Sequence, residues 1–141
     1  MKRKKFLVFG SPKIEQPEIN EVVDSLKSGW LGTGPKVKKF ELAFKRYMRV
    51  PHAVAVNSCT AALFLSLKAV GIQAGDEVIT TPLTFAATAN VILHCGAKPV
   101  FADVDRVTMN IDTEEVKKKI TRRTKAVIPV HFAGRPCHME P

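Results

Sequence analysis

Residues 57–61 read Asn-Ser-Cys-Thr-Ala and join an apolar run, residues 52–56, to a helix-like run that Gly71 closes. This order predicts a strand, a tight polar turn and a buried helix. Ser58 is placed to be the N-cap of the helix, so the next backbone N–H groups have no partner within it. They point outward with the positive end of the helix dipole, which makes the turn a candidate anion site. A serine that only caps a core helix gives the same local pattern, and the flanking segments decide between the two interpretations.

Four flanking segments carry further motifs. They are residues 28–35 (Ser-Gly-Trp-Leu-Gly-Thr-Gly-Pro), residues 75–82 (Gly-Asp-Glu-Val-Ile-Thr-Thr-Pro), Thr84-Phe85, and residues 130–136 (Val-His-Phe-Ala-Gly-Arg-Pro). In this order and spacing the chain resembles the sugar aminotransferases of the DegT/DnrJ/EryC1/StrS type, which use pyridoxal 5′-phosphate. The resemblance covers nearly the whole chain, from about Phe9 to Pro141.

The resemblance implies a cofactor site. Cys59 and Thr60, flanked by Ser58 and Ala61, match the positions whose backbone and hydroxyl groups hold the cofactor phosphate. Phe85 matches the position that stacks on the pyridine ring, and aromatic stacking contributes about 0.5–1.5 kcal/mol beyond area burial. Without the resemblance, Phe85 would be read as an ordinary core residue.

The resemblance also implies the reaction, in which glutamate supplies an amino group that the cofactor passes to a keto group on a nucleotide-linked sugar. Trp30 and Thr33 lie in the segment near the substrate, although Trp30 could equally be a loop anchor. The chain stops before the family's acidic residue that pairs with the pyridine nitrogen and before its Schiff-base lysine. No catalytic residue is therefore assigned, and we expect an inactive fragment that binds the cofactor weakly or not at all. His138 and Glu140 stand where the family usually has acids.

Alternating helix and strand patterns predict an α/β fold. Apolar spacing predicts helices over residues 18–27, 35–49, 62–70, 84–95 and 113–120, and strands over residues 52–56, 77–80, 99–103 and 125–131. Such alternation implies a mainly parallel sheet with helices on both faces. The resemblance identifies this as part of the large domain of the aspartate-aminotransferase-like fold (fold type I). We expect an N-terminal arm over residues 1–15 and the first portion of the cofactor-binding large domain over residues 16–141.

Two local features sharpen these expectations. Ile111 and Val116 flank Asp112 and Glu115 as a hydrophobic staple around a capping box, at the start of the helix over residues 113–120. Pro129 should place the last strand near an edge or a bulge.

The composition is that of a globular protein, with 45% apolar and 25% charged residues. The net charge of +9 raises a nucleic-acid hypothesis, but the basic clusters lack an aromatic-interleaved or helix-turn-helix signature.

The three cysteines form no closed disulfide set and show no metal-ligand spacing. This suits a cytoplasmic protein without a metal. The apolar segment after the basic N-terminus is too short for a signal peptide, and the longest uncharged stretch, residues 78–97, is interrupted by polar residues, so no membrane span is expected. The resemblance to the family implies a homodimer or larger assembly. Two other functions remain open beside the aminotransferase: a catalytically dead cofactor- or anion-binding remnant, and a basic regulatory or nucleic-acid-binding module.

Overall fold

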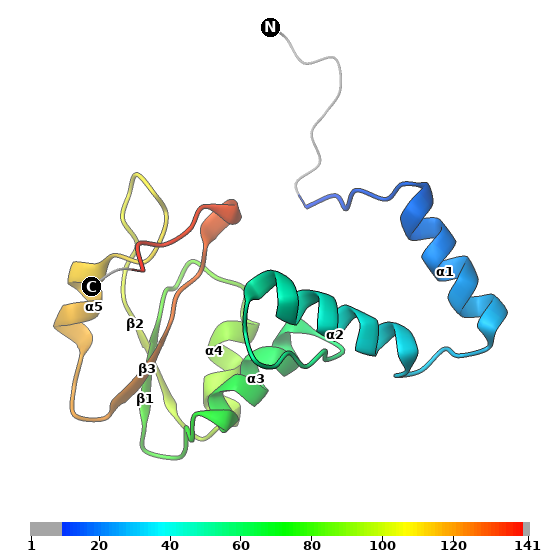
Figure 1. Cartoon of the computed structure of the whole chain (residues 1–141). Helices are drawn as coiled ribbons and strands as arrows, with labels where there is room; N and C mark the ends of the chain where they lie inside the picture. Colours follow the sequence, from blue (N-terminus) through cyan, green and yellow to red (C-terminus); the bar gives the residue numbers. More distant parts are fainter. Residues whose placement is uncertain (1–9, 140–141) are drawn as a thin grey trace, which may run out of the picture. The chain divides into compact units, whose positions relative to one another are not determined.

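A computed structural model describes residues 10–139 of the chain (Figure 1). They divide into two compact units, with the boundary between Ala55 and Val56. The expected arm over residues 1–15 falls mostly outside the described residues, and its boundary remains a prediction.

The first unit consists of two helices, α1 (Gln16–Ser28) and α2 (Pro35–Met48), as the periodicity predicts. Both begin with a proline in the first turn, where the missing N–H costs nothing. At the start of α1, Glu15 and Glu18 form a reciprocal capping box. The two helices are tied by Lys36, whose ammonium group pairs with Glu21 at 2.6 Å and so lowers the pKa of that carboxyl group. Neither helix contains a buried residue.

The second unit is built on a three-stranded parallel sheet of β1 (Glu77–Thr80), β2 (Lys98–Phe101) and β3 (Thr124–Ile128), in the order β2-β1-β3. The chain moves from β1 to β2 in one direction and then crosses β1 to reach β3. Because parallel crossovers are right-handed, this reversal places the two connecting helices on opposite faces. In Figure 1, α4 (Ala87–His94) and α5 (Thr113–Lys119) lie on opposite sides of the sheet. The expected α/β sheet is confirmed.

The core lies between the sheet and two helices on one of its faces: α4 contacts β1 and β2, and α3 (Cys59–Ala69) packs beside α4. Every residue of β1 is buried, including the polar Glu77 and Thr80 on either side of Val78 and Ile79. The buried core cluster comprises Leu67, Ile72, Val78, Val91, Ile92, Cys95 and Ala97. These side chains connect the central strand with the helices on one face.

The predicted strand over residues 52–56 is wrong, because these residues form no regular secondary structure and pair with no strand in the described part of the chain. A strand exists only with a partner, and the Ala55 N–H donates instead to the Glu41 carboxylate at 2.8 Å. The sequence pattern alone cannot supply the missing partner.

Three other boundaries also differ. The helix expected over residues 84–95 begins only at Ala87, because Thr84 and Phe85 belong to the turn before it. The strands expected over residues 99–103 and 125–131 are β2 and β3, which end at Phe101 and Ile128, so Pro129 lies just beyond its strand. The edge position expected for the last strand is confirmed within the described sheet, where β3 is an outer strand. The pairing of β1 with β3 also has a register shift between Glu77 and Val78.

The capping box expected at the start of α5 forms only in part. Asp112 accepts a hydrogen bond from the Glu114 N–H at 2.8 Å and is the N-cap. Glu115 pairs with Lys118 at 2.6 Å rather than reaching back to the cap, because the lysine lies one turn further along the same helix.

Candidate functional site

The turn before α3 has the geometry of an open helix N-terminus. Ser58 is the N-cap, and its hydroxyl accepts a hydrogen bond from the Ala61 N–H at 3.1 Å, while its carbonyl accepts from the Ala62 N–H. Ala61, which the resemblance places at the end of the phosphate turn, therefore offers no free N–H to an anion, and its assignment to the cofactor site through that group is wrong. The N–H groups of Cys59 and Thr60 have no hydrogen-bond partner among residues 10–139, and both residues are exposed. Two amides and the positive end of an eleven-residue helix thus face outward.

Phe85 lies in the turn that follows β1. Its side chain is 82% exposed, so it is not a core residue. The turn is held by side-chain hydrogen bonds: Thr81 Oγ1 accepts from the Leu83 N–H at 3.1 Å, and the hydroxyls of Thr84 and Thr88 lie 2.8 Å apart. A buried threonine at the strand end therefore fixes the turn while the aromatic ring projects from it.

The first turns of α3 and α4 belong to the same edge of the sheet. The two helices pack side by side, and their last turns adjoin, since a Cβ added at Gly96 would lie 3.3 Å from the Ala74 Cβ. Two helices that pack side by side with adjacent carboxyl ends run in the same direction. The N-termini of α3 and α4 therefore both lie at the carboxyl edge of the parallel sheet. Ligands of open α/β sheets bind at this carboxyl edge. The structure thus brings residues 58–61 and Phe85 to one edge.

The segment with Trp30 and Thr33 forms a closed loop in the first unit. The Trp30 indole N–H donates to the Thr33 carbonyl at 3.0 Å, and the ring covers Gly34 so closely that a Cβ there would lie 2.0 Å from the indole nitrogen. The loop that its three glycines would make flexible is therefore braced by the tryptophan, which remains 59% exposed. This supports the loop-anchor interpretation of Trp30 and leaves its substrate role a prediction.

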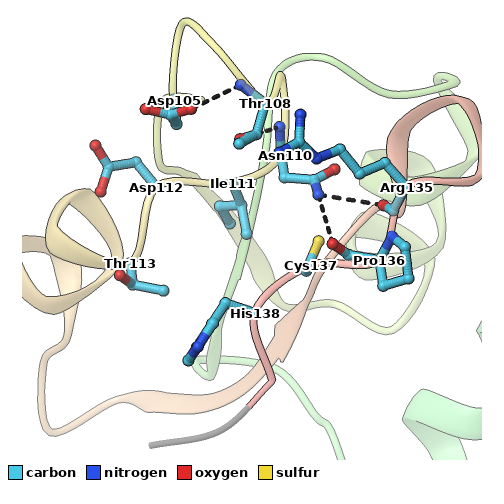
Figure 2. A pocket seen from close by; sticks show the side chains of 10 residues that line it. All are labelled: Asp105, Thr108, Asn110, Ile111, Asp112, Thr113, Arg135, Pro136, Cys137 and His138. Atoms are coloured by element: carbon cyan, nitrogen blue, oxygen red, sulfur yellow. Dashed lines mark hydrogen bonds between the residues drawn. The ribbon is translucent and has the colours of Figure 1, made fainter.

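A pocket of about 480 Å³ lies between the loop after β2 and the segment after β3 (Figure 2). Its lining includes Asp105, Asp112, Arg135 and His138. Asp105 accepts hydrogen bonds from the N–H groups of Thr108 and Val107, and these bonds, that of Thr108 first, lower the pKa of its carboxyl group. Asp105 is thus engaged in shaping the loop, and Asp112 caps α5.

Asn110 connects these two segments and was missed by the sequence reasoning. It is 5% exposed; its amide NH₂ donates to the carbonyls of Arg135 and Pro136 at 3.2 and 2.9 Å, and its carbonyl accepts from the Phe132 N–H at 3.0 Å. All three partners lie 22 to 26 residues further along the chain, so no local pattern signals the role. The three contacts fix the path of the chain after β3.

No group of three or more metal-ligating side chains occurs within residues 10–139. None of the helices in that range is both long and apolar enough to pass through a bilayer. All three cysteines are free thiols, of which only Cys59 is exposed.

The comparisons with known proteins agree with this architecture. The model of the DegT/DnrJ/EryC1/StrS aminotransferase family matches residues 12–141. The spore coat polysaccharide biosynthesis protein SpsC of Bacillus subtilis is 58% identical over 139 residues, which are 99% of this chain and 36% of that protein. Among solved structures, the putative sugar aminotransferase Spr1654 of Streptococcus pneumoniae superimposes with a TM-score of 0.84 at 44% identity, over 93% of this chain and 33% of that one. The 3-amino-5-hydroxybenzoic acid synthase structure has a TM-score of 0.86 at 36% identity, over 99% and 36% of the two chains.

The parallel sheet with helix N-termini at its carboxyl edge is that of the fold type I aminotransferases. The chain belongs to the DegT/DnrJ/EryC1/StrS aminotransferase family. It spans about a third of the length of the relatives it matches. The family is pyridoxal-phosphate-dependent, and the Spr1654 enzyme has been solved with the cofactor in both its pyridoxal and its pyridoxamine form.

The residues at the turn fit the phosphate of this cofactor. A phosphate group accepts hydrogen bonds on several oxygens, and the turn offers two N–H groups without partners among the described residues and the exposed Thr60. None of the turn residues from Asn57 to Ala61 is acidic, so nothing in the turn itself would repel the anion.

Proposed function

We propose that the chain is the cofactor-phosphate-binding part of a pyridoxal-phosphate-dependent sugar aminotransferase, one that moves an amino group from glutamate to a keto group of a nucleotide-linked sugar. The single observation that carries the proposal is the pair of unpartnered amides, Cys59 and Thr60, at the start of α3 in a chain of this family. The similarity to a polysaccharide biosynthesis protein at 58% identity supports a sugar substrate.

In this proposal each residue has a defined task. Ser58 holds the first turn of α3 by accepting the Ala61 N–H, which leaves the amides of Cys59 and Thr60 directed at the phosphate. Phe85 lies against the flat face of the pyridine ring, which suits an aromatic side chain that no core contact requires. The bound cofactor supplies an electron sink for carbon–nitrogen bond chemistry, and the protein supplies its orientation.

The remaining assignments are also proposals. Trp30 and Thr33 contribute to the substrate side, with Trp30 bracing the loop that carries Thr33. Residues 16–141 form the first portion of the large domain after an arm of residues 1–15, and the protein acts in the cytoplasm as a homodimer or larger assembly.

The anion site is tested by titrating the chain with inorganic phosphate and with pyridoxamine 5′-phosphate, followed by phosphorus NMR or calorimetry. Binding should be weak, because a few hydrogen bonds and one stack contribute only about 0.5–1.5 kcal/mol each. Thr60→Asp should abolish the binding of both ligands by charge repulsion, whereas the neutral Thr60→Asn should retain it. Equal binding to the Asp and Asn variants contradicts a phosphate site at this turn.

The stacking role of Phe85 is tested with the same two ligands. Phe85→Ala should weaken pyridoxamine 5′-phosphate and leave inorganic phosphate unchanged, and Phe85→Leu should separate aromatic stacking from simple apolar contact. An equal loss of both ligands in Phe85→Ala shows that the ring supports the fold instead.

The polypeptide of residues 1–141 should not by itself transaminate a keto sugar nucleotide with glutamate. The lysine that the family uses lies, by resemblance, outside the segment this chain matches, and no other residue in the chain is assigned that role. Turnover by the purified 141-residue polypeptide would require a lysine among residues 1–141 to take the part.

A further inference from the structure

Thr88 holds the turn that carries Phe85 in two ways. Its hydroxyl lies 2.8 Å from the hydroxyl of Thr84, the residue just before the aromatic ring. Its backbone N–H donates to the Phe85 carbonyl at 3.0 Å. One residue therefore engages both Thr84 and Phe85, while the Phe85 ring itself is 82% exposed.

The position of Thr88 is fixed by the core. It lies in the first turn of α4 and is 6% exposed, and Val91 and Ile92 on the same helix are fully buried. The helix packs against β1, β2 and α3. A close-packed interior of this kind leaves little freedom to its side chains. The two hydrogen bonds of Thr88 thus connect an exposed turn to a rigid part of the second unit.

The hydroxyl pair does not serve to cap the helix. The N-cap of α4 is Ala86, and no side chain caps its first turn. A capping threonine accepts a hydrogen bond from a backbone N–H of that turn. The Thr84 hydroxyl bonds instead to the side chain of Thr88, whose N–H is engaged by Phe85. Both hydrogen bonds of Thr88 therefore act on the turn.

Fixing the backbone at Phe85 restricts the direction of its ring. The rotamers open to a side chain depend on the φ and ψ angles of its own residue, and the Thr88 N–H holds the Phe85 carbonyl in place. An exposed ring loses conformational freedom when it is immobilised against a ligand, and a ring that already has the bound orientation loses less. The contacts of Thr88 therefore favour stacking by Phe85.

We propose that Thr88 is a positioning residue, which orients the Phe85 side chain for stacking on the flat ring of a pyridoxal-type cofactor. This inference rests on the proposed function, since Phe85 can be positioned for stacking only if it stacks. Thr88 acts through Phe85, so the loss of its hydroxyl should weaken binding of the ring and spare binding of the phosphate.

The experiment titrates the 141-residue chain and its variants by calorimetry with pyridoxamine 5′-phosphate and with inorganic phosphate. The ratio of the two affinities is the ring preference. Thr88→Val keeps the size of the side chain and the backbone N–H but loses the hydroxyl. It should lower the ring preference about two- to fivefold, less than the complete loss of the stack in Phe85→Ala. Thr88→Ser, which keeps the hydroxyl, should retain the wild-type preference.

Thr84→Val removes the same hydrogen bond from its other end, and so provides the test if Thr88→Val does not fold. It should lower the ring preference equally, and the double variant should lose no more than either single one, because only one bond is removed. Thr80→Val is the matched control. It also removes a hydrogen bond of a buried threonine, the one to the Ile128 carbonyl, but that bond does not involve the turn. Its ring preference should equal that of the wild type.

A measurement without ligand separates positioning from simple stabilisation. Carbon–carbon and carbon–nitrogen scalar couplings of the isotope-labelled chain report the χ1 populations of Phe85 by NMR. Thr88→Val should spread these populations over more rotamers, whereas Thr88→Ser and Thr80→Val should not. A residue that only stabilises the fold would leave the rotamers of an exposed ring unchanged.

The outcomes distinguish this inference from the proposed function. An unchanged ring preference in Thr88→Val, an equal loss of both ligands, or unchanged Phe85 rotamers overturns the inference while the phosphate site stands. If Phe85→Ala itself retains the ring preference, stacking by Phe85 is wrong, and the role of Thr88 is rejected with it.

Discussion

The two units of the chain use their apolar side chains differently. In the second unit, β1 is buried along its whole length, and the side chains of α3 and α4 close over it. In the first unit, α1 and α2 carry apolar stripes of the same helical period, but neither contains a buried residue, and Val22 and Leu26 are each 61% exposed. The difference teaches that an amphipathic pattern predicts a helix and the face that it will bury, whereas burial itself depends on a second surface.

The comparison is tested most strongly by matched truncations of one large aliphatic residue in each unit. Ile92 is fully buried, so Ile92→Ala should lower the free energy of unfolding by about 2–5 kcal/mol, the range for a large aliphatic residue cut to alanine in a core. Leu26→Ala should change it by less than about 0.5 kcal/mol, because the side chain is mostly in water. Urea titrations followed by circular dichroism give both values. Similar losses in the two variants would mean that α1 is covered in solution.

The exposed stripes of the first unit predict self-association. Folded proteins rarely leave contiguous apolar faces and unpaired strand edges open to water. The chain should therefore form dimers or larger species at micromolar concentration. Val22→Lys should reduce the association by placing a charge in the stripe, whereas Asn20→Lys, an equal change of charge at an exposed polar residue of α1, should not. Light scattering measures the mass; a monodisperse wild-type monomer contradicts the prediction.

How far the sequence alone predicts the molecule depends on where each residue's partner lies. The bounds of β1 are predicted correctly because the Val78-Ile79 pair between turn residues, Gly75-Asp76 before it and Pro82 after it, is a local pattern. The strand over residues 52–56 was wrong because pairing is not a local property.

The candidate site divides in the same way. The N-cap role of Ser58 follows from the order of neighbouring residues and is confirmed. Phe85 could be placed in the turn, and not in the helix, only once the hydrogen bonds of Thr81 and Thr84 were known. Asn110 gave no signal, since its partners are long-range backbone groups.

The buried carboxylate of Glu77 should make the stability of the second unit depend on pH. Glu77 is 3% exposed, and its carboxylate accepts from the Thr121 hydroxyl at 2.7 Å and pairs with Arg123 at 3.0 Å. The Thr121 hydrogen bond, followed by the positive charges of Arg123 and Lys98, lowers the pKa of Glu77 against the opposing effect of burial.

A depressed pKa means that this stabilisation is present above the unfolded-state pKa, about 4.3, and is lost as the pH falls through the lower folded-state pKa. Glu77→Gln should therefore be less stable than the wild type at pH 7, and the difference should shrink below about pH 4. Glu114→Gln, which removes only an exposed pair with Lys117, is the control and should have almost no effect. Denaturant titrations at several pH values check this; a pH-independent difference would point to packing rather than charge.

The smallest expected effect concerns the loop of the first unit. A Cβ at Gly34 would lie 2.0 Å from the Trp30 indole nitrogen, so Gly34→Ala should displace the ring and break its hydrogen bond to the Thr33 carbonyl. The loss is local and costs about 0.5–1.5 kcal/mol, the net value of one hydrogen bond. It should leave unfolding of the second unit unchanged. Because Trp30 is the only tryptophan, its fluorescence reports the change directly: acrylamide should quench it more strongly in Gly34→Ala.

Gly32→Ala is the matched control, since no atom lies within 4 Å of an added Cβ there. Equal quenching in the two variants would show that the ring does not rest on Gly34 in solution.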